Sequence, residues 1–309
     1  MAEQKNAQNV DVNQLLKVRR EKLQDLQERG KDPFQITKYD MTHHSMEIKD
    51  NFDELEGKTV SIAGRMMFKR VMGKASFCNI QDLQGSIQSY VARDNIGEES
   101  YADFKKYDVG DILGIKGEVF KTKTGEISIH AKEITLLSKS LQVLPEKFHG
   151  LTDVETRYRK RYVDLIINDE AKEILLTRCR IVSAVREFFN GEEFLEVETP
   201  TLHPIMGGAS AKPFVTHYNA LDNDFYLRVA PELYLKKLVV GGIDRVFEIG
   251  RNYRNEGIDK NHVPEFTALE AYMAYGDYND MADLIYRLVR FVVNKAVSYT
   301  HLTLPTKLE

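Results

Sequence analysis

Apolar residues recur at every second position through much of residues 55–137, a spacing that is typical of β-strands and not of helices. Turn signals that contain glycine separate these segments, as at Gln84-Gly85 and Thr124-Gly125. The alternating apolar residues are Val60, Ile62, Met66, Phe68, Cys78, Ile80, Ile87, Val91, Ile127 and Ile129. Several short strands joined by such turns predict a small, closed β-barrel.

Helical spacing is expected on both sides of this barrel. Before it, leucines at helical spacing predict a helix that begins with a capping box at Asp11 and ends at Gly30. After the connector at residues 138–162, a second helix is predicted from a cap at Asn168 or Asp169 to Gly191. Its expected core stripe is Ile174, Leu175, Ile181, Val182, Val185, Phe188 and Phe189.

Composition excludes several classes of protein. The 309 residues contain 43 Lys and Arg against 47 Asp and Glu, so the formal net charge is −4 and a basic coat for nucleic acid is excluded. Cys78 and Cys179 are far apart, which excludes a disulfide framework and a zinc ribbon. No apolar run approaches the roughly 20 residues that span a bilayer, and the N-terminus is polar. We therefore expect a cytoplasmic protein without a membrane segment.

One face of the predicted barrel is expected to be polar and aromatic. Its members are Phe77, Asn79, Gln81, Ser86, Gln88 and Tyr90 on two adjacent strands, and Glu126, Ser128 and His130 on a later strand. Rings stack on unpaired bases, and amides and carboxylates read base edges, so this face suits single-stranded RNA. Upstream residues that would hold phosphates are Arg65, Lys69, Arg70 and Lys74. The alternative is an ordinary barrel surface with one exposed ring among scattered polar residues.

A second polar surface is predicted where residues 245–256 and 266–274 form two antiparallel strands. The shared face carries Glu248, Gly250, Asn252, Arg254, Glu256, Phe266, Ala268, Glu270 and Tyr272. An arginine can fork onto a phosphate or carboxylate, an aromatic ring can stack on a purine, and carboxylates can take an amine. This set suits a nucleotide together with a polar small molecule, although a salt-bridged sheet face accounts for it equally well.

Two short segments add candidate ligand contacts. Pro231 is expected at the first position of a helix, which makes Glu232 either a first-turn acid on the helix dipole or a ligand residue. The pair Gly207-Gly208 is either a turn or a place where the backbone approaches a ligand closely.

Together these segments resemble the class II lysyl-tRNA synthetases of the bacterial type. FLEVETP at residues 194–200 is similar to the first motif of the family, and RNYRNEG at residues 251–257 is similar to the second. Further similar stretches are MMFKRVMGKASF, LPEKFHGLTDVETRYRKRYVDL, GGASAKPF, APELYLK and HVPEFTALEAY. The resemblance covers roughly residues 10–296 and is specific because the motifs occur in combination.

The resemblance implies an α+β protein: an N-terminal OB-fold barrel that binds an anticodon, followed by an antiparallel sheet with helices that activates lysine with ATP. The implied ranges are 1–54 for a helix and lead-in, 55–137 for the barrel, 138–162 for a connector, 163–296 for an incomplete catalytic domain and 297–309 for a non-native tail. It also implies tRNA(Lys) and L-lysine as partners, and a homodimer formed through the first motif.

Site residues carry over from the family by position. Arg254 would be catalytic, bridging the lysine carboxylate and the ATP α-phosphate, and it would bind ATP together with Glu256, His262 and Phe266. The implied lysine site is Gly208, Glu232, Glu270 and Tyr272, and the implied anticodon site is Arg70, Phe77, Gln88 and Glu126. The related aspartyl and asparaginyl enzymes share the architecture. A carboxylate at Glu232 suits an ammonium group and repels an aspartate side chain, which favours lysine.

The sequence departs from the family pattern in three places. Val263 replaces an asparagine, and Glu192-Glu193 replaces Arg-Gly before Phe194. The third motif, with its second arginine and the late carboxylates that would bind Mg²⁺, is not found, so no metal ligands are assigned to this chain. Residues 297–309 match nothing in the family and are expected to be foreign sequence. We therefore expect a lysine–tRNA ligase fragment with little or no turnover; the alternatives are a non-catalytic tRNA-binding fragment or an aspartyl- or asparaginyl-type synthetase.

Overall fold

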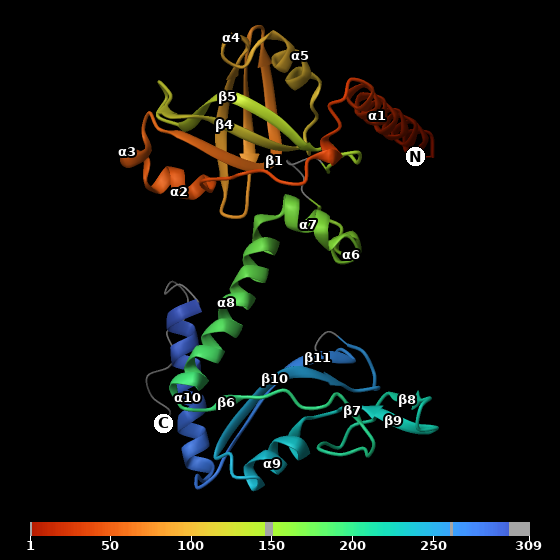
Figure 1. Cartoon of the computed structure of the whole chain (residues 1–309). Coiled ribbons are helices and arrows are strands. Elements are labelled where there is room, and N and C mark those ends of the chain that lie inside the picture. The colour runs from red at the N-terminus through yellow and green to blue at the C-terminus, as the bar shows by residue number, and fades with distance from the viewer. Residues whose placement is uncertain (1, 146–150, 260–261, 297–309) are drawn as a thin grey trace. The chain divides into compact units, whose positions relative to one another are not determined.

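The computed structural model describes residues 2–145, 151–259 and 262–296, with side chains from residue 13 onward. The described part divides into two compact units, Met1–Val163 and Asp164–Glu309 (Figure 1). The predicted non-native tail, residues 297–309, lies outside the described residues. Among the described helices, none combines the length and the apolar character that a membrane span requires.

The first unit is built on a closed five-stranded barrel in the order β1-β2-β3-β5-β4, which confirms the predicted barrel (Figure 1). The strands are β1 (Thr59–Met72), β2 (Ala75–Gln81), β3 (Ser86–Ala92), β4 (Ile112–Lys121) and β5 (Ile127–Ser138). β3 and β5 pair in parallel, and the other neighbours are antiparallel. The alternating residues Val60, Ile62, Met66, Cys78, Ile80, Ile87, Val91 and Ile129 are all buried inside it.

Phe68 breaks this pattern, and its assignment to the apolar series was wrong. Phe68 is 50% exposed. The register of β1 against β2 shifts between Met66, which faces Ile80, and Phe68, which faces Asn79. A bulge inserts one residue and so turns every later side chain of the strand to the opposite face.

Short helices surround the barrel. They are η1 (Pro33–Gln35), α2 (Ser45–Asp50), α3 (Phe52–Leu55), α4 (Arg93–Ile96) and α5 (Glu98–Lys106), of which α4 and α5 lie between β3 and β4. The first helix, α1 (Ala2–Glu28), starts well before the predicted capping box, so Asp11 lies within the helix. Arg19 of α1 is buried, and its guanidinium donates to the carbonyl oxygens of Val109, Ser140 and Gln142, which offsets the cost of burying the charge.

The connector between barrel and second unit holds α6 (Val154–Arg159) and α7 (Arg161–Ile167). The second unit then contains a three-stranded sheet in the order β11-β10-β6. Its strands are β10 (Arg245–Tyr253), β11 (Glu265–Met273) and the two-residue β6 (Leu195–Glu196). β10 and β11 are antiparallel as predicted, whereas β6 pairs with β10 in parallel. A smaller sheet has the order β7-β9-β8, from β7 (Leu202–His203), β8 (Val215–Tyr218) and β9 (Asn223–Leu227).

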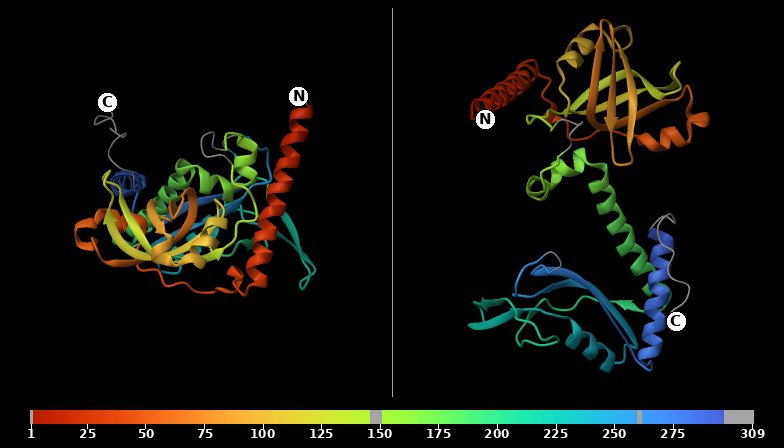
Figure 2. Two further views of the ribbon diagram at one scale, coloured as in Figure 1. Left: turned by 90° about the horizontal axis from the view of Figure 1, so that it is seen from above. Right: turned by 180° about the vertical axis from the view of Figure 1, so that it is seen from behind.

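Helices α8 (Asp169–Gly191) and α10 (Tyr278–Ala296) lie side by side in this unit (Figure 2), and α9 (Glu232–Val240) follows β9. The C-terminal half of α8 supplies Phe188 and Phe189 to a core shared with Phe247 of β10. The N-terminal half carries exposed Ile174 and Leu175, so their assignment to the core stripe was wrong. Within the described residues, that half extends past the elements that bury the other end.

The C-terminus of α8 forms a Schellman motif. The Phe194 N–H donates to the Phe189 carbonyl oxygen (3.0 Å), and the Glu193 N–H donates to that of Asn190 (3.2 Å). The rings of Phe189 and Phe194 pack with their centroids 5.1 Å apart, which is the apolar contact usual for this motif. Glu193 occupies the left-handed position with a φ of 62°. The sequence departure at residues 192–193 therefore puts a side chain where the motif favours glycine.

Replacing Glu193 with glycine should stabilise the second unit. A non-glycine residue in the left-handed region costs roughly 1–2 kcal/mol, so we expect the Glu193→Gly variant to gain about 1 kcal/mol in the free energy of unfolding. Glu193→Ala is the matched control, because it removes the carboxylate and keeps the Cβ. Denaturant unfolding should show the gain for glycine and not for alanine; an equal gain in both would show that charge, not backbone strain, is responsible.

Candidate functional site

The face of β10 and β11 that points away from the α8–α10 core carries the predicted polar set. Cα pairs across the two strands are Val246–Tyr272, Glu248–Glu270, Gly250–Ala268 and Asn252–Phe266, so these side chains share one face. The opposite face carries Phe247, Ile249, Ala271 and Met273, which belong to the α8–α10 core. The two-residue period thus grouped this face correctly.

A buried ion pair that sequence reasoning missed lies beneath this face. The Arg228 Nη1 donates to Glu248 Oε1 at 2.5 Å, and the two side chains are 3% and 5% exposed. Arg228 also donates to the carbonyl oxygen of Arg251 (2.8 Å), and the Thr199 hydroxyl donates to Glu248 Oε2 (2.6 Å). The salt-bridged interpretation therefore holds for Glu248, which is satisfied by protein groups.

Gly250 makes room for this arginine. A Cβ built on Gly250 would lie only 2.0 Å from Arg228 Nη2. Glycine is required at this position because the Arg228 guanidinium approaches the backbone closely, and not because the backbone adopts an unusual φ. Arg228 directly follows β9, and nothing local in the sequence marks it as buried, since most arginines extend to solvent.

Arg254 and Phe266 are brought together as predicted. The Arg254 guanidinium lies over the Phe266 ring, with Cζ 5.1 Å from the centroid, and the Arg254 N–H donates to the Pro264 carbonyl oxygen (2.9 Å). The side-chain Nε of Arg254 is buried and has no hydrogen-bond partner among the described residues. A buried guanidinium nitrogen without a protein partner favours a ligand that supplies the acceptor.

Glu256 and His262 take different positions. Glu256 Oε1 accepts from the main-chain N–H of Lys212 (3.2 Å), which ties the end of β10 to the GGASAKPF loop. His262 is exposed in the loop between β10 and β11, where Nδ1 lies 2.7 Å from Asp259 Oδ2. The described contacts do not join His262 to Arg254, Glu256 or Phe266. The neighbouring departure from the family, Val263, is 54% exposed.

A cluster of two acids and a phenol forms the other part of this surface. The Tyr272 hydroxyl donates to Glu270 Oε2 at 3.1 Å. Burial raises the pKa of the Glu270 carboxyl, and the negative charge of nearby Glu232 raises it further, although the hydrogen bond from Tyr272 works in the opposite direction. Burial and the same Glu270 carboxylate raise the pKa of the Tyr272 phenol. A cation bound beside Glu270 would offset the burial and the nearby negative charge that raise its pKa.

Glu232 stands at the first residue of α9, one residue after Pro231, which is the N-cap and not the first helical residue. Its Oε1 accepts from Lys236 Nζ (2.5 Å), and that ammonium also lies 5.9 Å from the Tyr272 ring centroid. Gly208, with a φ of 92°, lies against this corner: its hypothetical Cβ would be 3.6 Å from the Glu232 Cβ. The predicted lysine-binding residues therefore lie close together.

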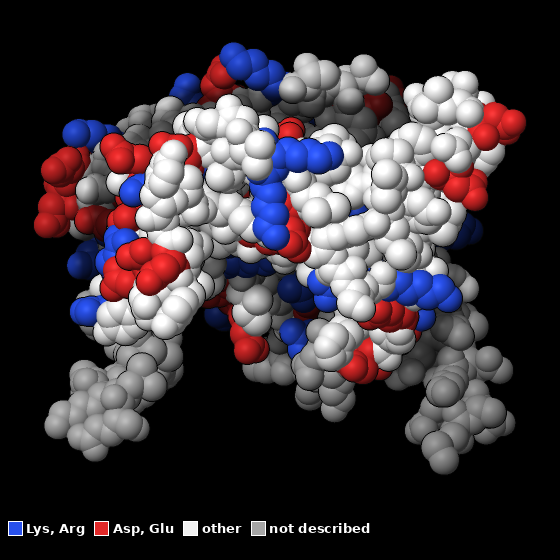
Figure 3. Space-filling view, turned by 90° about the horizontal axis from the view of Figure 1, so that it is seen from below, with Lys and Arg blue, Asp and Glu red and all other residues white. Residues whose placement is uncertain are grey.

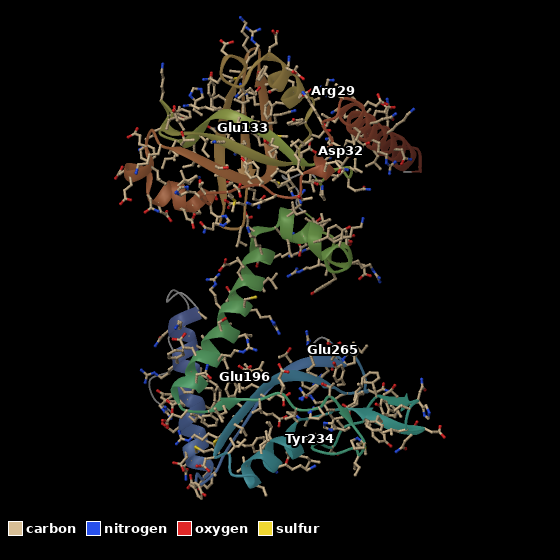
Figure 4. All side chains as sticks on the ribbon, in the orientation of Figure 1. Arg29, Asp32, Glu133, Glu196, Tyr234 and Glu265 are labelled. Carbon is tan, nitrogen blue, oxygen red and sulfur yellow. The ribbon has the colours of Figure 1, made fainter. Side chains whose placement is uncertain are left out.

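Further side-chain contacts hold α9, β6 and β11 in place. The ring of Tyr234 on α9 packs on His203 with the centroids 4.7 Å apart. Glu196 on β6 pairs with Arg186 of α8 (2.9 Å), and Glu265 at the start of β11 pairs with Arg251 (3.5 Å); Figure 4 labels Tyr234, Glu196 and Glu265.

Within the described residues, no group of three or more His, Cys, Asp or Glu side chains could hold a metal ion.

The barrel carries the second candidate surface on its outer face. Phe77 faces Tyr90 across β2 and β3, and Tyr90 faces His130 across β3 and β5. The ring centroids are 5.1 Å apart for Phe77–Tyr90, 5.2 Å for Tyr90–His130 and 5.8 Å for His130–Phe120. The rings form one continuous row across four strands, and the contribution of Phe120 was not predicted.

The polar residues of this surface lie beside the row of rings. Arg70 is exposed and faces Phe77 across β1 and β2, and Gln88 is half-buried between Asn79 and Ser128 on the neighbouring strands. Glu126 is exposed just before β5, with its carboxylate 3.6 Å from Lys49 Nζ. Arg70, Phe77 and Gln88 thus lie on one side of the barrel, and Glu126 lies two residues before Ser128, which faces Gln88.

On the face shown in Figure 3, Lys and Arg lie among Asp and Glu. The formal net charge of −4 gives no overall attraction for a polyanion, so recognition of one would depend on local groups such as Arg70.

Two family models match this chain. Residues 60–137 match the family model "OB-fold nucleic acid binding domain", and residues 153–308 match "tRNA synthetases class II (D, K and N)". The second match extends over residues 297–308, which were expected to be foreign. It covers slightly more than half of the 309 residues.

Several curated relatives from clostridia carry the name "Lysine--tRNA ligase". The protein of Clostridium novyi is 57% identical over 285 residues, covering 92% of this chain and 56% of the relative. That of Clostridium acetobutylicum is 55% identical (94% and 57% covered), and that of Clostridium tetani is 53% identical (96% and 60%). The chain thus spans less than two thirds of the length of these relatives. From the family model, the barrel and the sheet taken together, the chain belongs to the class II tRNA synthetases of the D, K and N group.

Proposed function

We propose that this chain is part of a lysine–tRNA ligase that forms lysyl-adenylate from lysine and ATP and transfers lysine to tRNA(Lys). The observation that carries this proposal is the shared surface on β10, β11 and α9, where Arg254 and Phe266 lie on the same sheet face as Glu270 and Tyr272. The names of the clostridial relatives support lysine as the amino acid. The proposed location is the cytoplasm.

Arg254 is proposed to bind both reacting groups. In adenylate formation a lysine carboxylate oxygen attacks the α-phosphorus of ATP, and pyrophosphate leaves. Negative charge then gathers on the oxygens around phosphorus, where a fixed guanidinium is most useful. The unpartnered Arg254 Nε and the ring beneath the guanidinium support this role, because the ring fixes its plane. Glu256 and His262 are proposed to help hold ATP.

Phe266 is proposed to stack on adenine. One side of its ring faces the Arg254 guanidinium, so adenine would use the other side. ATP binds as a substrate and Mg²⁺ would neutralise its phosphates. The described residues do not provide a metal-ligand cluster, so Mg²⁺ enters no step assigned to these side chains.

The acids select the amino acid. Glu232, Glu270 and Tyr272 would take the two ammonium groups of lysine, and Gly208 would leave room for the α-amino group. An ammonium would lower the raised pKa of Glu270 and so favour its charged form. An aspartate side chain would add a third carboxylate, which argues against the aspartyl and asparaginyl alternatives.

The barrel is proposed to read the anticodon through Arg70, Phe77, Gln88 and Glu126. Because the barrel is closed and its candidate surface is fully described, RNA binding without catalysis is the second candidate function of this chain. A homodimer through the first motif is also proposed. It is supported by the exposed apolar residues Leu195 of β6 and Ile174 and Leu175 of α8.

Loss of the Phe77 ring should weaken RNA binding. Stacking of one base on an aromatic ring is worth roughly 1–3 kcal/mol, so Phe77→Ala should lower the affinity for a stem-loop with a UUU anticodon about 5- to 150-fold. Fluorescence anisotropy with a labelled stem-loop measures this. Phe34→Ala is the matched control, since Phe34 is an exposed ring of the same unit that lies on η1, outside the strands that carry the row of rings. Equal losses in the two variants would contradict an anticodon site at Phe77.

A further inference from the structure

Ser128 lies between two of the residues proposed to read the anticodon. Its Oγ is 3.0 Å from Gln88 Oε1 and 3.3 Å from the main-chain carbonyl oxygen of Glu126. Ser128 is fully buried, although it lies on the polar side of β5, directly opposite Gln88 of β3. A buried hydroxyl in this place acts on the orientation of Gln88 and not on the ligand directly.

The hydroxyl has one proton to donate, and the shorter contact is to Gln88. Donation to Oε1 fixes the carbonyl end of the side-chain amide toward β5. The other neighbour of Gln88 across the strands is Asn79, and the described contacts include no hydrogen bond between these two side chains. The orientation of the Gln88 amide therefore rests on the contact with Ser128.

In this orientation the two N–H groups of Gln88 Nε2 have no partner in the described part of the chain and are left for a ligand. Uracil presents a carbonyl oxygen at position 4 of its base edge, whereas cytosine presents an amine there. An amide that offers only N–H donors can hydrogen-bond to the carbonyl oxygen of uracil at this position. It cannot hydrogen-bond to the amine of cytosine, which is also a donor. Without the Ser128 proton the amide could rotate and offer either end.

We propose that Ser128 is a positioning residue that holds the Gln88 amide with Nε2 outward, so that this part of the barrel selects uracil over cytosine. The inference rests on the proposed anticodon-binding function and adds the cause of its base preference. It assigns specificity to a residue that the RNA does not touch.

The test uses the full chain and stem-loops that carry UUU or one of the three single U-to-C replacements. Wild-type protein should prefer U at one position by about fivefold or more, because a good amide–base contact discriminates by that much. Ser128→Ala should bring the U-to-C ratio at that position to within about twofold. Ser128→Thr keeps the hydroxyl and should restore the ratio.

A double-mutant cycle separates this role from a purely structural one. In a Gln88→Ala background, Ser128→Ala should change neither affinity nor ratio, provided that thermal unfolding shows all variants folded. An unchanged ratio in Ser128→Ala overturns the inference, even if all loops bind more weakly. A wild-type preference for C at that position overturns it too, because the amide would then face outward with Oε1. If the wild type binds no loop, the proposed anticodon function fails first, and the inference fails with it.

Discussion

Replacing Arg228 with methionine should reduce the free energy of unfolding of the second unit by about 3–5 kcal/mol. The substitution removes the cation and leaves Glu248 buried with only the Thr199 hydroxyl as its partner among the described residues. A buried carboxylate without a cation keeps its full desolvation cost. Denaturant unfolding gives the magnitude, and hydrogen exchange in β10 identifies the unit that opens.

The double variant Arg228→Met with Glu248→Met tests the cause. When both charges are removed, no desolvated charge is left, and buried ion pairs replaced by apolar residues are often neutral or stabilising. The double variant should therefore recover most of the lost stability. A double variant as unstable as the single one would show that packing or the hydrogen bond to Arg251, and not charge, is what Arg228 provides.

Replacing Lys139 with methionine should destabilise the barrel by a similar amount, about 3–5 kcal/mol. The Lys139 side chain is 1% exposed. Its ammonium lies 2.9 Å from both carboxylate oxygens of Asp111, which is fully buried, and 2.5 Å from Asp108 Oδ2. Two carboxylates would lose their shared cation. Lys22→Met is the matched control: Lys22 also binds Asp108 (2.6 Å), but its side chain is 28% exposed, so its loss should cost no more than about 1 kcal/mol.

The cost of Lys139→Met should also depend on pH. Burial alone would raise the pKa of Asp108, but hydrogen bonds from Lys139 and Lys22 outweigh it and hold the pKa below its ordinary value. A carboxyl group with a lowered folded-state pKa contributes stability above its unfolded value of about 3.9, and loses it as pH falls through the folded value. The difference between wild type and variant should thus be largest near neutral pH and shrink below about pH 4. A constant difference would exclude the charges as its source.

The spacing of apolar residues along the sequence was sufficient to predict much of the fold. The barrel strands followed from a two-residue period, and short turns placed Phe77 beside Tyr90. Phe68 could not be predicted, because a bulge adds one residue without a change in the apolar pattern. Ile174 and Leu175 have the helical spacing of core residues, and only the arrangement of the neighbouring elements decides that they are exposed.

The candidate site divides in the same way. Arg254, Phe266, Glu270 and Tyr272 lie on one pair of strands, so periodicity alone grouped them. Gly208 and Glu232 reach this surface from distant segments, and only the family resemblance linked them to it. The Arg228–Glu248 pair joins residues 20 positions apart across separate elements, and no local signal marks such a contact.

The central claim is that one surface binds a carboxylate or phosphate at Arg254 and an amine at Glu232 and Glu270. Isothermal titration of the chain with a non-hydrolysable lysyl-adenylate analogue, and with its aspartyl counterpart, tests this directly. We predict that the lysyl compound binds more tightly than the aspartyl one, and that Arg254→Ala and Glu232→Gln each weaken its binding about tenfold or more. Equal binding of the two compounds, or lysyl binding that neither substitution changes, would contradict the account.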